Sequence, residues 1–413
     1  MTELLDLWLY GTLMGSLEYD AKRQRMSVRY YQDALERFGL ASPILSASLP
    51  LRREPYPNAL TRDFFDGLLP EGDTRALIAR DLGETNDTFS LMRALGRDCA
   101  GALVVQPADE EPPPSAAQLD AARPLAQSDV ATRLAALPQT PLGVDNEVRL
   151  SLAGIQQKLV LTRLADGSWA LPVGGVPSTH ILKPQIPNPQ WPETVQNEAY
   201  CMRLARHAGL NVASIELEDF GDGPVLVVER FDRAVQDGKV KRLHQEDGCQ
   251  ALGKPPQVKY QENGGPTFKQ LAALLIRYDR NHDLPALLAQ ATFNVAVGNA
   301  DAHGKNYSFS HPEDGSLSLT PAYDLMCTMV YPLSLTMGMA VDEVRRLDRT
   351  TADRLINEAI GWGLGASIAH GVVRDTLLAI AANIDAVAEE VPVDSRILHV
   401  IRTQTESLSA PLA

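Results

Sequence analysis

The feature that most constrains the fold is a change of hydrophobic pattern close to Thr267. Over residues 150–231, short apolar runs predict strands, with one amphipathic helix among them. After Thr267, apolar residues recur every three or four positions, which predicts helices. This order predicts an α+β fold with two lobes, strand-rich and then helical, and a cleft between them. The expected strands are 158–162, 169–171, 180–183 and 224–229, and the expected helices are 197–207, 268–278, 284–297, 351–360, 372–388 and 395–407.

The first hundred residues predict an additional N-terminal α/β unit. An alternating stretch over residues 5–17, with turns at Gly11 and Gly15, predicts a strand pair. The acidic, proline-rich segment Pro107–Pro114 cannot form a helix or a central strand, so it predicts a boundary. Further strands are expected at 26–31 and 101–105, and helices at 63–69, 74–82, 88–95 and 128–137. The expected divisions are an N-terminal subdomain at 1–106, a linker with a bridging helix at 107–148, a strand-rich lobe with a hinge at 149–266 and a helical lobe at 267–413.

Composition narrows the functional class. The chain carries 38 Lys and Arg against 52 Asp and Glu, a net charge of −14. This argues against a general binder of nucleic acid or anionic membranes, since both need a basic face, but a local basic patch or a basic partner stays possible. The start lacks the features of a secretory signal, and no stretch approaches the roughly 18 uninterrupted apolar residues of a membrane helix. The 4 cysteines are far apart, which is typical of buried thiols, and we expect a cytoplasmic protein with no membrane partner.

The segment Gly298–Asn306 carries the strongest indication of chemistry. Asp301 and Asn306 are spaced like the catalytic aspartate and the metal-binding asparagine of a kinase catalytic loop. Asp324 follows a strand-like stretch and can complete a Mg²⁺ site that bridges nucleotide phosphates. Asn, Asp and Gly are also ordinary turn residues, so either segment alone favours a solvated turn. The two segments together, in this order, favour a kinase.

Lys183 ends an apolar strand and can supply a cation for the phosphates. Glu198 lies in the following helix and can orient this lysine, as a strand lysine and a helix glutamate pair in kinases. Two other interpretations stay open. Lys183 can be an edge-strand lysine that prevents aggregation, and Glu198 can be an acid that is favourable in the first turn of a helix.

Two further segments fit a nucleotide site less specifically. Small residues in Ser151–Lys158 let backbone N–H groups approach an anion, although a hairpin turn explains them equally well. Val227–Asp232 ends a strand where the lobes are expected to meet, which suits contacts to a purine, and a buried strand end is the alternative. His303 has no second ligand at zinc spacing. Inside the loop, His303 and Lys305 can both hold phosphate oxygens, which suits lysine as a point charge.

These motifs, taken in order, closely resemble the HipA family of serine/threonine kinases, the toxins of bacterial type II toxin–antitoxin pairs. The likeness extends into the first unit through Phe64–Pro70 and Gly96–Gly101. It therefore implies a protein-kinase-like fold with an additional N-terminal subdomain. The motifs that carry it are Ser151–Lys158, Thr179–Pro184, Asn197–Glu198, Val228–Arg233, Gln245–Cys249, Asp301–Asn306 and Tyr323–Leu325.

The resemblance implies a role for each matched position. Asp301 would be the catalytic acid/base residue, and Asn306 and Asp324 would bind Mg²⁺. Lys183 would hold the phosphates of ATP, and Ser151 matches a loop serine that family members autophosphorylate to switch themselves off. The other positions expected to contact ATP are the covering loop Ala153, Gly154, Ile155, Gln156, Gln157 and Lys158, the hinge Glu229, Arg230 and Phe231, and His303, Lys305 and Tyr323.

The resemblance also implies partners. The expected target is an aminoacyl-tRNA synthetase, notably the glutamyl enzyme, whose phosphorylation stalls translation. A small HipB-like helix-turn-helix antitoxin would bind the kinase and carry it to operator DNA, and this antitoxin can supply the basic charge that the chain lacks. Two alternatives stay open: a kinase of similar fold that acts on a small molecule, and a nucleotide-binding corepressor that acts through its antitoxin without turnover.

Overall fold

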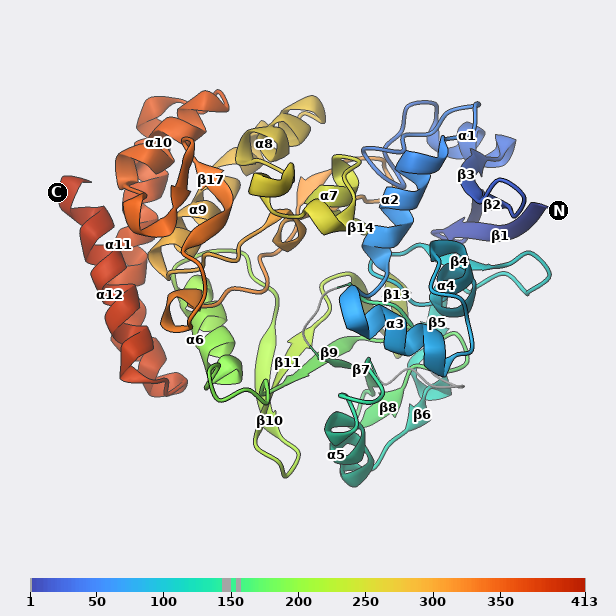
Figure 1. Cartoon of the computed structure of the whole chain (residues 1–413), viewed down its shortest axis with the longest axis horizontal. Coiled ribbons are helices and arrows are strands. Elements are labelled where there is room, and N and C mark those ends of the chain that lie inside the picture. The colour runs from blue at the N-terminus through green and yellow to red at the C-terminus, as the bar shows by residue number, and fades with distance from the viewer. Residues whose placement is uncertain (1, 143–149, 154–156, 413) are drawn as a thin grey trace.

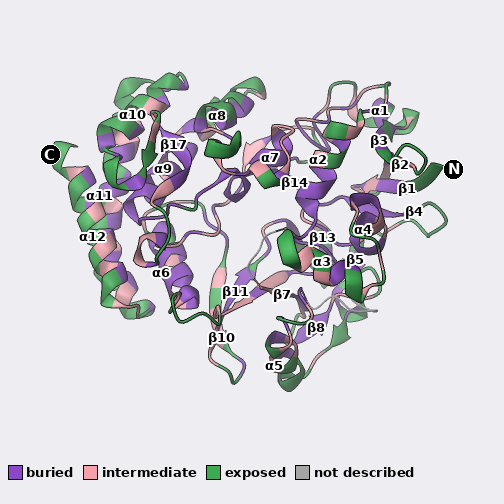
Figure 2. Ribbon diagram, viewed as in Figure 1, coloured by how far each residue is buried: buried purple, intermediate pink, exposed green. Residues whose placement is uncertain are grey.

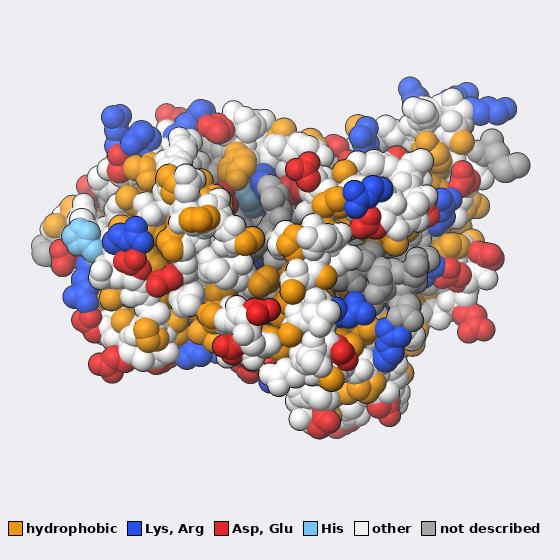
Figure 3. All heavy atoms as spheres, turned by 60° about the horizontal axis from the view of Figure 1, so that its bottom comes forward, with side chains coloured by type: hydrophobic (Ala, Val, Ile, Leu, Met, Phe, Trp, Pro, Cys, Tyr) orange, Lys and Arg blue, Asp and Glu red, His pale blue; other side chains and the backbone are white. Residues whose placement is uncertain are grey.

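The computed structural model describes residues 2–142, 150–153 and 157–412. It contains an N-terminal unit (blue in Figure 1), a strand-rich lobe (green) and a helical lobe (orange and red). The predicted α+β fold with two lobes and an additional N-terminal unit is therefore confirmed. None of the described helices is both long and apolar enough to cross a bilayer. Acidic and basic side chains are interspersed over the face shown in Figure 3.

The N-terminal unit is a four-stranded antiparallel sheet, in the order β3-β2-β1-β4, covered by short helices. The chain reverses at Gly11, whose φ of 72° favours glycine. The prediction of a second turn at Gly15 is wrong, because this residue lies within β2. A Cβ there would lie 2.0 Å from the carbonyl oxygen of Arg29 on β3, so close strand pairing excludes a side chain. The elements are β1 (Thr2–Leu9), β2 (Thr12–Asp20), β3 (Arg25–Tyr30), β4 (Val104–Pro107), α1 (Gln32–Phe38), α2 (Asn58–Leu68), α3 (Gly72–Asp81) and α4 (Thr88–Leu95).

The segment that follows β4 is bound to the strand-rich lobe. Residues 108–115 contain neither helix nor strand, as the prolines predict. After them, β5 pairs with β13 and β6 pairs with β8, so both short strands extend sheets of the lobe. The elements of this segment are β5 (Ala116–Gln118), β6 (Arg123–Pro124) and the bridging helix α5 (Gln127–Ala135).

The strand-rich lobe contains a six-stranded sheet in the order β10-β11-β9-β7-β8-β6. Lys183 lies on β9, an inner strand, so it is not an edge-strand lysine. The sequence did not predict β10, because acidic residues interrupt its apolar pattern. The elements are β7 (Leu159–Arg163), β8 (Trp169–Leu171), β9 (His180–Pro184), α6 (Thr194–His207), β10 (Ile215–Asp219), β11 (Pro224–Glu229), β12 (Arg233–Gln236) and β13 (Lys239–Arg242).

The helical lobe is built around α9, which is buried along most of its length, whereas α10, α11 and α12 expose their outer faces (Figure 2). Its elements are β14 (Gln245–Asp247), α7 (Gly248–Ala251), α8 (Phe268–Arg277), α9 (Leu284–Ala296), β15 (Ser308–Ser310), β16 (Ser318–Leu319), β17 (Thr336–Val341), β18 (Val344–Arg346), α10 (Ala352–Gly361), α11 (Ala366–Glu390) and α12 (Ser395–Ser409). The described residues also form the 3-10 helices η1 (Leu119–Ala121), η2 (Pro256–Val258), η3 (Gln261–Asn263), η4 (Asn281–Asp283), η5 (Gly304–Asn306), η6 (Thr328–Val330), η7 (Leu347–Arg349) and η8 (Ala410–Leu412).

The hydrophobic residues form two main cores. One fills the helical lobe and the inner face of α6. The other is shared by the N-terminal unit and the strand-rich lobe, since it contains Phe64 and Leu103 from the former and Leu161 and Val227 from the latter. Ile181 packs against both cores. The N-terminal unit is thus packed onto the strand-rich lobe through apolar side chains.

Candidate active site

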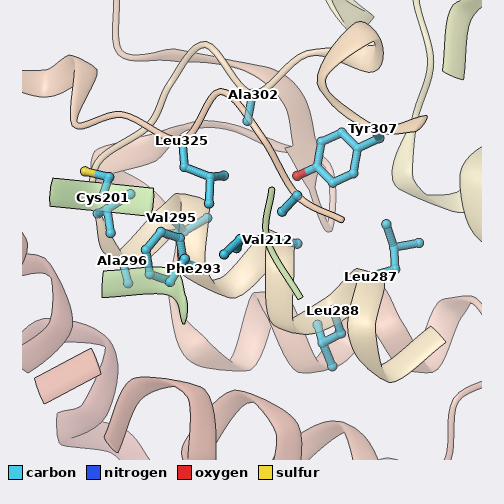
Figure 4. Packing of buried hydrophobic residues seen from close by; sticks show 14 of the residues in the cluster. Cys201, Val212, Leu287, Leu288, Phe293, Val295, Ala296, Ala302, Tyr307 and Leu325 are labelled. Atoms are coloured by element: carbon cyan, nitrogen blue, oxygen red, sulfur yellow. The ribbon is translucent and has the colours of Figure 1, made fainter. Parts of the chain in front are cut away.

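The loop that follows α9 lies over the core of the helical lobe. Figure 4 shows Ala302, Tyr307 and Leu325 directed toward side chains of α9 such as Phe293. The backbone of the loop is fixed as well, because the amide of Ala300 donates to the Thr328 hydroxyl at 2.8 Å. These contacts hold the loop rigidly at the junction of the lobes.

Strand β17 braces the same loop from the other side. The amide of Gly338 donates to the carbonyl of Ala300 at 2.8 Å. A Cβ at Gly338 would lie 2.7 Å from the carbonyl oxygen of Ala302, so only glycine permits this approach. The loop between α9 and η5 is therefore positioned by packing on two sides.

Asp301 projects from this loop, and the residue taken as a whole is exposed to solvent, although its carboxyl group is partly enclosed. The phenol of Tyr260 donates a hydrogen bond of 2.7 Å to its Oδ1 atom. Loss of water around the carboxyl raises the pKa of Asp301, and the Tyr260 hydrogen bond opposes that rise. A carboxylate with a raised pKa is a better proton acceptor for a hydroxyl group.

Asp324 joins the two lobes. Its Oδ1 atom accepts from the ammonium of Lys183 at 3.0 Å, and its Oδ2 atom accepts from the side-chain Nδ2 of Asn306 at 2.7 Å. The lysine charge lowers the pKa of Asp324 to about 2, so this carboxyl is anionic at neutral pH. Asp324 has a φ of 59°, which is uncommon for a residue other than glycine and is often found at functional sites.

Glu198 orients the same lysine. Its Oε1 atom lies 2.7 Å from the ammonium, and the Glu198 side chain is only 2% exposed. Burial lowers the pKa of Lys183, but Asp324 and Glu198 together outweigh burial and raise it. Helix α6 begins at Thr194 and has no acid in its first turn, so a favourable helix-terminus position does not explain Glu198.

The covering loop is partly outside the described residues, since Gly154, Ile155 and Gln156 are not among them. The ammonium of Lys158 donates to the carbonyl of Ala153 at 2.5 Å, which joins the described residues on either side of that gap. Burial, together with the charge of Lys183, lowers the pKa of Lys158 to about 8. Gln157 is half-buried at the same end of the loop.

Ser151 is fully buried at the start of this loop. Its hydroxyl donates to the carbonyl of Leu68 at 2.7 Å, and its amide donates to the carbonyl of Asp98 at 2.9 Å. Both acceptors belong to the N-terminal unit. In this conformation the serine is an anchor between the loop and that unit.

The three residues of the expected hinge, Glu229, Arg230 and Phe231, lie in different environments. The amides of Glu229 and Arg230 donate to Ser214 and Thr179 within the lobe, each at 2.9 Å. The Arg230 guanidinium turns into a buried cluster and pairs with Asp232 at 2.8 Å. The Phe231 ring packs against Tyr323 with 5.8 Å between ring centroids. Among the hinge side chains, Phe231 is therefore the one in contact with another expected nucleotide residue.

The other residues expected to contact ATP, His303, Lys305 and Tyr323, also differ in their surroundings. Burial lowers the pKa of His303 to about 4, so its imidazole is neutral at pH 7. The Tyr323 hydroxyl donates to the carbonyl of Lys305 at 2.6 Å. The Lys305 ammonium lies 3.4 Å from Glu71 and 3.3 Å from Asp247, and two carboxylates thus neutralise it. The structure therefore directs Lys305 toward the N-terminal unit.

Sequence reasoning did not single out Tyr260, Lys259 or Glu71. Lys259 pairs with Glu71 at 3.2 Å, and Tyr260 follows it in the chain. The loop that carries both has no periodic pattern, and these contacts join segments far apart in sequence. No signal in the single sequence points to them.

The donor set fits Mg²⁺ bound together with phosphates. The described residues contain no cluster of three or more His, Cys, Asp or Glu side chains that could hold a metal alone. Asp324 offers an anionic carboxylate, and the Asn306 side chain lies beside it. The Asn306 amide nitrogen faces Asp324 here, while its oxygen accepts from the backbone amide of His303 at 3.1 Å, so rotation of the amide would turn the oxygen toward a bound ion. Magnesium is commonly held by one or two such oxygen ligands plus substrate phosphates. The residues present therefore fit the ion that the sequence predicts.

Two lobes with an aspartate-bearing loop in the helical one and a glutamate-oriented lysine in the strand-rich one define a protein-kinase-like enzyme. Residues 150–389 match the HipA-like C-terminal domain, and residues 5–106 match the HipA N-terminal domain. The chain belongs to the HipA family, which confirms the resemblance seen in the sequence.

Known relatives cover nearly the whole chain. It is 41% identical over 395 residues to the Y4mE protein of Sinorhizobium fredii, with 94% of this chain and 92% of that protein aligned. It is 34% identical over 361 residues to the serine/threonine-protein kinase toxin HipA of Shewanella oneidensis, with 83% and 79% aligned. A solved complex of Shewanella oneidensis HipA, HipB and operator DNA matches with a TM-score of 0.82 at 30% identity, over 99% of this chain and 96% of that one. The chain is thus a HipA-like kinase along its whole length.

Proposed function

We propose that this protein is an ATP- and Mg²⁺-dependent serine/threonine kinase that acts as the toxin of a toxin–antitoxin pair. The observation that carries the proposal is the position of Asp324, which contacts Lys183 of one lobe and Asn306 of the other. This arrangement gathers a cation for phosphates and oxygen ligands for magnesium beside Asp301, the expected proton acceptor.

In the proposed reaction, the hydroxyl oxygen of the substrate bonds to the γ-phosphorus of ATP while the bond to the β–γ bridging oxygen breaks. Asp301 accepts the hydroxyl proton, and ADP leaves. Lys183 exchanges its contact with Asp324 for the phosphates, and Glu198 keeps it oriented. Asn306 and Asp324 would hold Mg²⁺, which neutralises phosphate charge when it is bound.

The partners follow from the relatives. The matched Shewanella structure contains HipB and operator DNA, and we infer a HipB-like helix-turn-helix antitoxin for this chain. DNA contact would come mainly through the antitoxin, because the chain has a net charge of −14. The proposed target is an aminoacyl-tRNA synthetase of the glutamyl type, in the cytoplasm. Autophosphorylation of Ser151 would switch the kinase off, since a phosphate adds about −1.5 to −2 charge near the site for ATP phosphates.

The proposal is tested by Asp301→Asn, which removes the proton acceptor and preserves shape. We expect labelled phosphate transfer from ATP to protein, and growth arrest in cells, to fall at least a hundredfold. Thermal unfolding should stay within about 2 °C of the wild type, because Asp301 is exposed.

An active Asp301→Asn protein would exclude this function. Incubation with lysate protein and with lysate metabolites, side by side, separates a protein kinase from a small-molecule kinase. If ATP is bound but consumed with neither, the corepressor alternative is correct.

A further inference from the structure

Tyr260 makes a contact that the proposed reaction does not yet explain. Its hydroxyl donates to Oδ1 of Asp301 at 2.7 Å, whereas no described residue donates a hydrogen bond to Oδ2. One oxygen of the carboxylate is thus held by the phenol, and the other stays available for a substrate hydroxyl. Burial, followed by the negative charge of Asp301, raises the pKa of Tyr260, so the phenol is a donor throughout the physiological range.

The ring of Tyr260 is fixed against the same loop. It meets the His303 ring edge to face, with 5.1 Å between centroids and an angle of 84°. Such a contact limits rotation of the phenol and directs its hydroxyl toward Asp301. The neutral imidazole of His303 thereby gains a structural role beside the catalytic loop.

The loop that carries Tyr260 is attached to the catalytic loop and to β17. The carbonyl of Lys259 accepts from the amide of Gly304 at 3.1 Å. The side chain of Gln261 accepts from the amide of Ala340 at 2.8 Å. The carbonyl of Tyr260 accepts from the amide of Gly265 at 3.0 Å, and a Cβ at Gly265 would lie 2.2 Å from the carbonyl oxygen of Val258. These bonds leave the tyrosine backbone little freedom.

The same loop is also attached to the N-terminal unit. The Lys259 ammonium lies 3.2 Å from Glu71, the residue that precedes α3, and the Lys259 side chain is 11% exposed. Glu71 in turn contacts Lys305 of the catalytic loop at 3.4 Å. An ion-pair network therefore connects the N-terminal unit with both sides of Asp301.

We propose that Tyr260 is a positioning residue for the transfer reaction, which holds the Asp301 carboxylate so that its free oxygen faces the substrate hydroxyl. This inference rests on the proposed function, because it assigns Tyr260 to the same catalytic aspartate. A base that is oriented by a third group is a common arrangement in active sites. Glu71 sets the position of the tyrosine through Lys259, which gives the N-terminal unit a part in catalysis.

The test is Tyr260→Phe in the full-length protein, which removes one hydroxyl and keeps the ring on His303. We expect kcat for transfer to protein to fall about tenfold, because the carboxylate loses its fixed orientation. KM for ATP should stay within about twofold, because phenylalanine keeps the ring contact with His303 and the lost hydroxyl bonds Asp301 rather than a residue expected to hold the nucleotide phosphates. A merely structural role would change KM and the unfolding temperature as well.

Tyr278→Phe is the matched control. Tyr278 also lies in the helical lobe, but its buried hydroxyl has no hydrogen-bond partner among the described residues. We expect this variant to keep kcat and KM within about twofold of the wild type.

The outcomes are distinguishable. If Tyr260→Phe keeps wild-type kcat while Asp301→Asn is inactive, the positioning role is wrong and the proposed function stands. If Asp301→Asn is active, the proposed function itself fails. If Tyr260→Phe unfolds at a much lower temperature and regains full kcat on cooling, Tyr260 is structural and the positioning role is wrong.

Discussion

At the scale of single residues, the site depends on a balance of buried charge. Lys183 is 12% exposed and is shared by Glu198 and Asp324. A buried ion pair adds little net stability, but removal of one partner leaves the other charge uncompensated. The contributions of Lys183 and Glu198 to stability can therefore be separated by mutating one residue alone and then both.

Lys183→Met is expected to destabilise the fold by about 3–5 kcal/mol, because Glu198 loses its counter-charge in a buried position. The double variant Lys183→Met/Glu198→Gln should recover most of that stability, since the stranded charge is gone. Neither variant should transfer phosphate. Urea unfolding measures the stabilities, and labelled ATP measures the activity.

If the double variant is no more stable than Lys183→Met, Glu198 is not held by the lysine in solution. If either variant transfers phosphate at the wild-type rate, Lys183 does not hold the nucleotide.

At the scale of elements, a buried charge cluster joins the N-terminal unit to the end of β11. Arg233 pairs with Asp98 at 2.8 Å, and Arg230 pairs with Asp232 at 2.8 Å, all with side chains at most 7% exposed. Although burial alone would raise the pKa of both carboxyls, the arginines outweigh it, and the pKa of each is lowered. The cluster fixes the hinge relative to the N-terminal unit.

The cluster predicts a loss of stability in acid. A carboxyl whose pKa is lower in the folded state stabilises the fold above its unfolded pKa of about 4, and this stability is lost as the pH falls toward the folded value. Asp232→Asn should destabilise the fold by about 3–5 kcal/mol at pH 7 and flatten the decline below pH 4. Urea unfolding between pH 7 and pH 3 measures both effects.

Asp348→Asn provides the comparison, because the Arg346–Asp348 pair has the same chemistry on the surface, with side chains 47% and 38% exposed. It should lower stability far less than Asp232→Asn does, because solvent screens the exposed pair. Equal losses in the two variants would show that burial of the cluster does not matter.

Elements were predictable where local chemistry determines them. Helix α8 begins after Thr267, whose side chain accepts from Gln270 while Gln270 caps in return, and the apolar spacing continues from there. β10 was missed because only two of its 5 residues, Ile215 and Leu217, are apolar, too few for their alternation with acidic residues to indicate a strand. The spacing of Asp301, Asn306 and Asp324 was readable from sequence. The contact of Tyr260 with Asp301 was not, because it depends on a loop with no period and on a distant fold partner.

At the scale of the whole molecule, the N-terminal unit and the strand-rich lobe share one hydrophobic core. Three of the 4 tryptophans report on these parts: Trp8 lies on β1, Trp169 lies on β8, and Trp362 lies at the end of α10 in the other core. Residues that share a core are expected to unfold together.

Fluorotryptophan-labelled protein, which gives a separate resonance for each tryptophan, tests this expectation. The Trp8 and Trp169 signals should show the same urea midpoint, whereas Trp362 is free to differ. The single changes Trp8→Phe, Trp169→Phe and Trp362→Phe assign the three resonances, and Trp362 serves as the control. A Trp8 signal that unfolds well before Trp169 would show that the N-terminal unit is an independent domain.

The burial of Ser151 under the N-terminal unit limits the rate at which this serine can be phosphorylated. Its hydroxyl is held by Leu68 and its backbone by Asp98, so a phosphate can reach it only during a rare local opening. If the serine is the off-switch, the lifetime of the active toxin is set by how often that seam opens, and a surplus of ATP does not shorten it. The rate of this local opening would then determine how long growth arrest lasts.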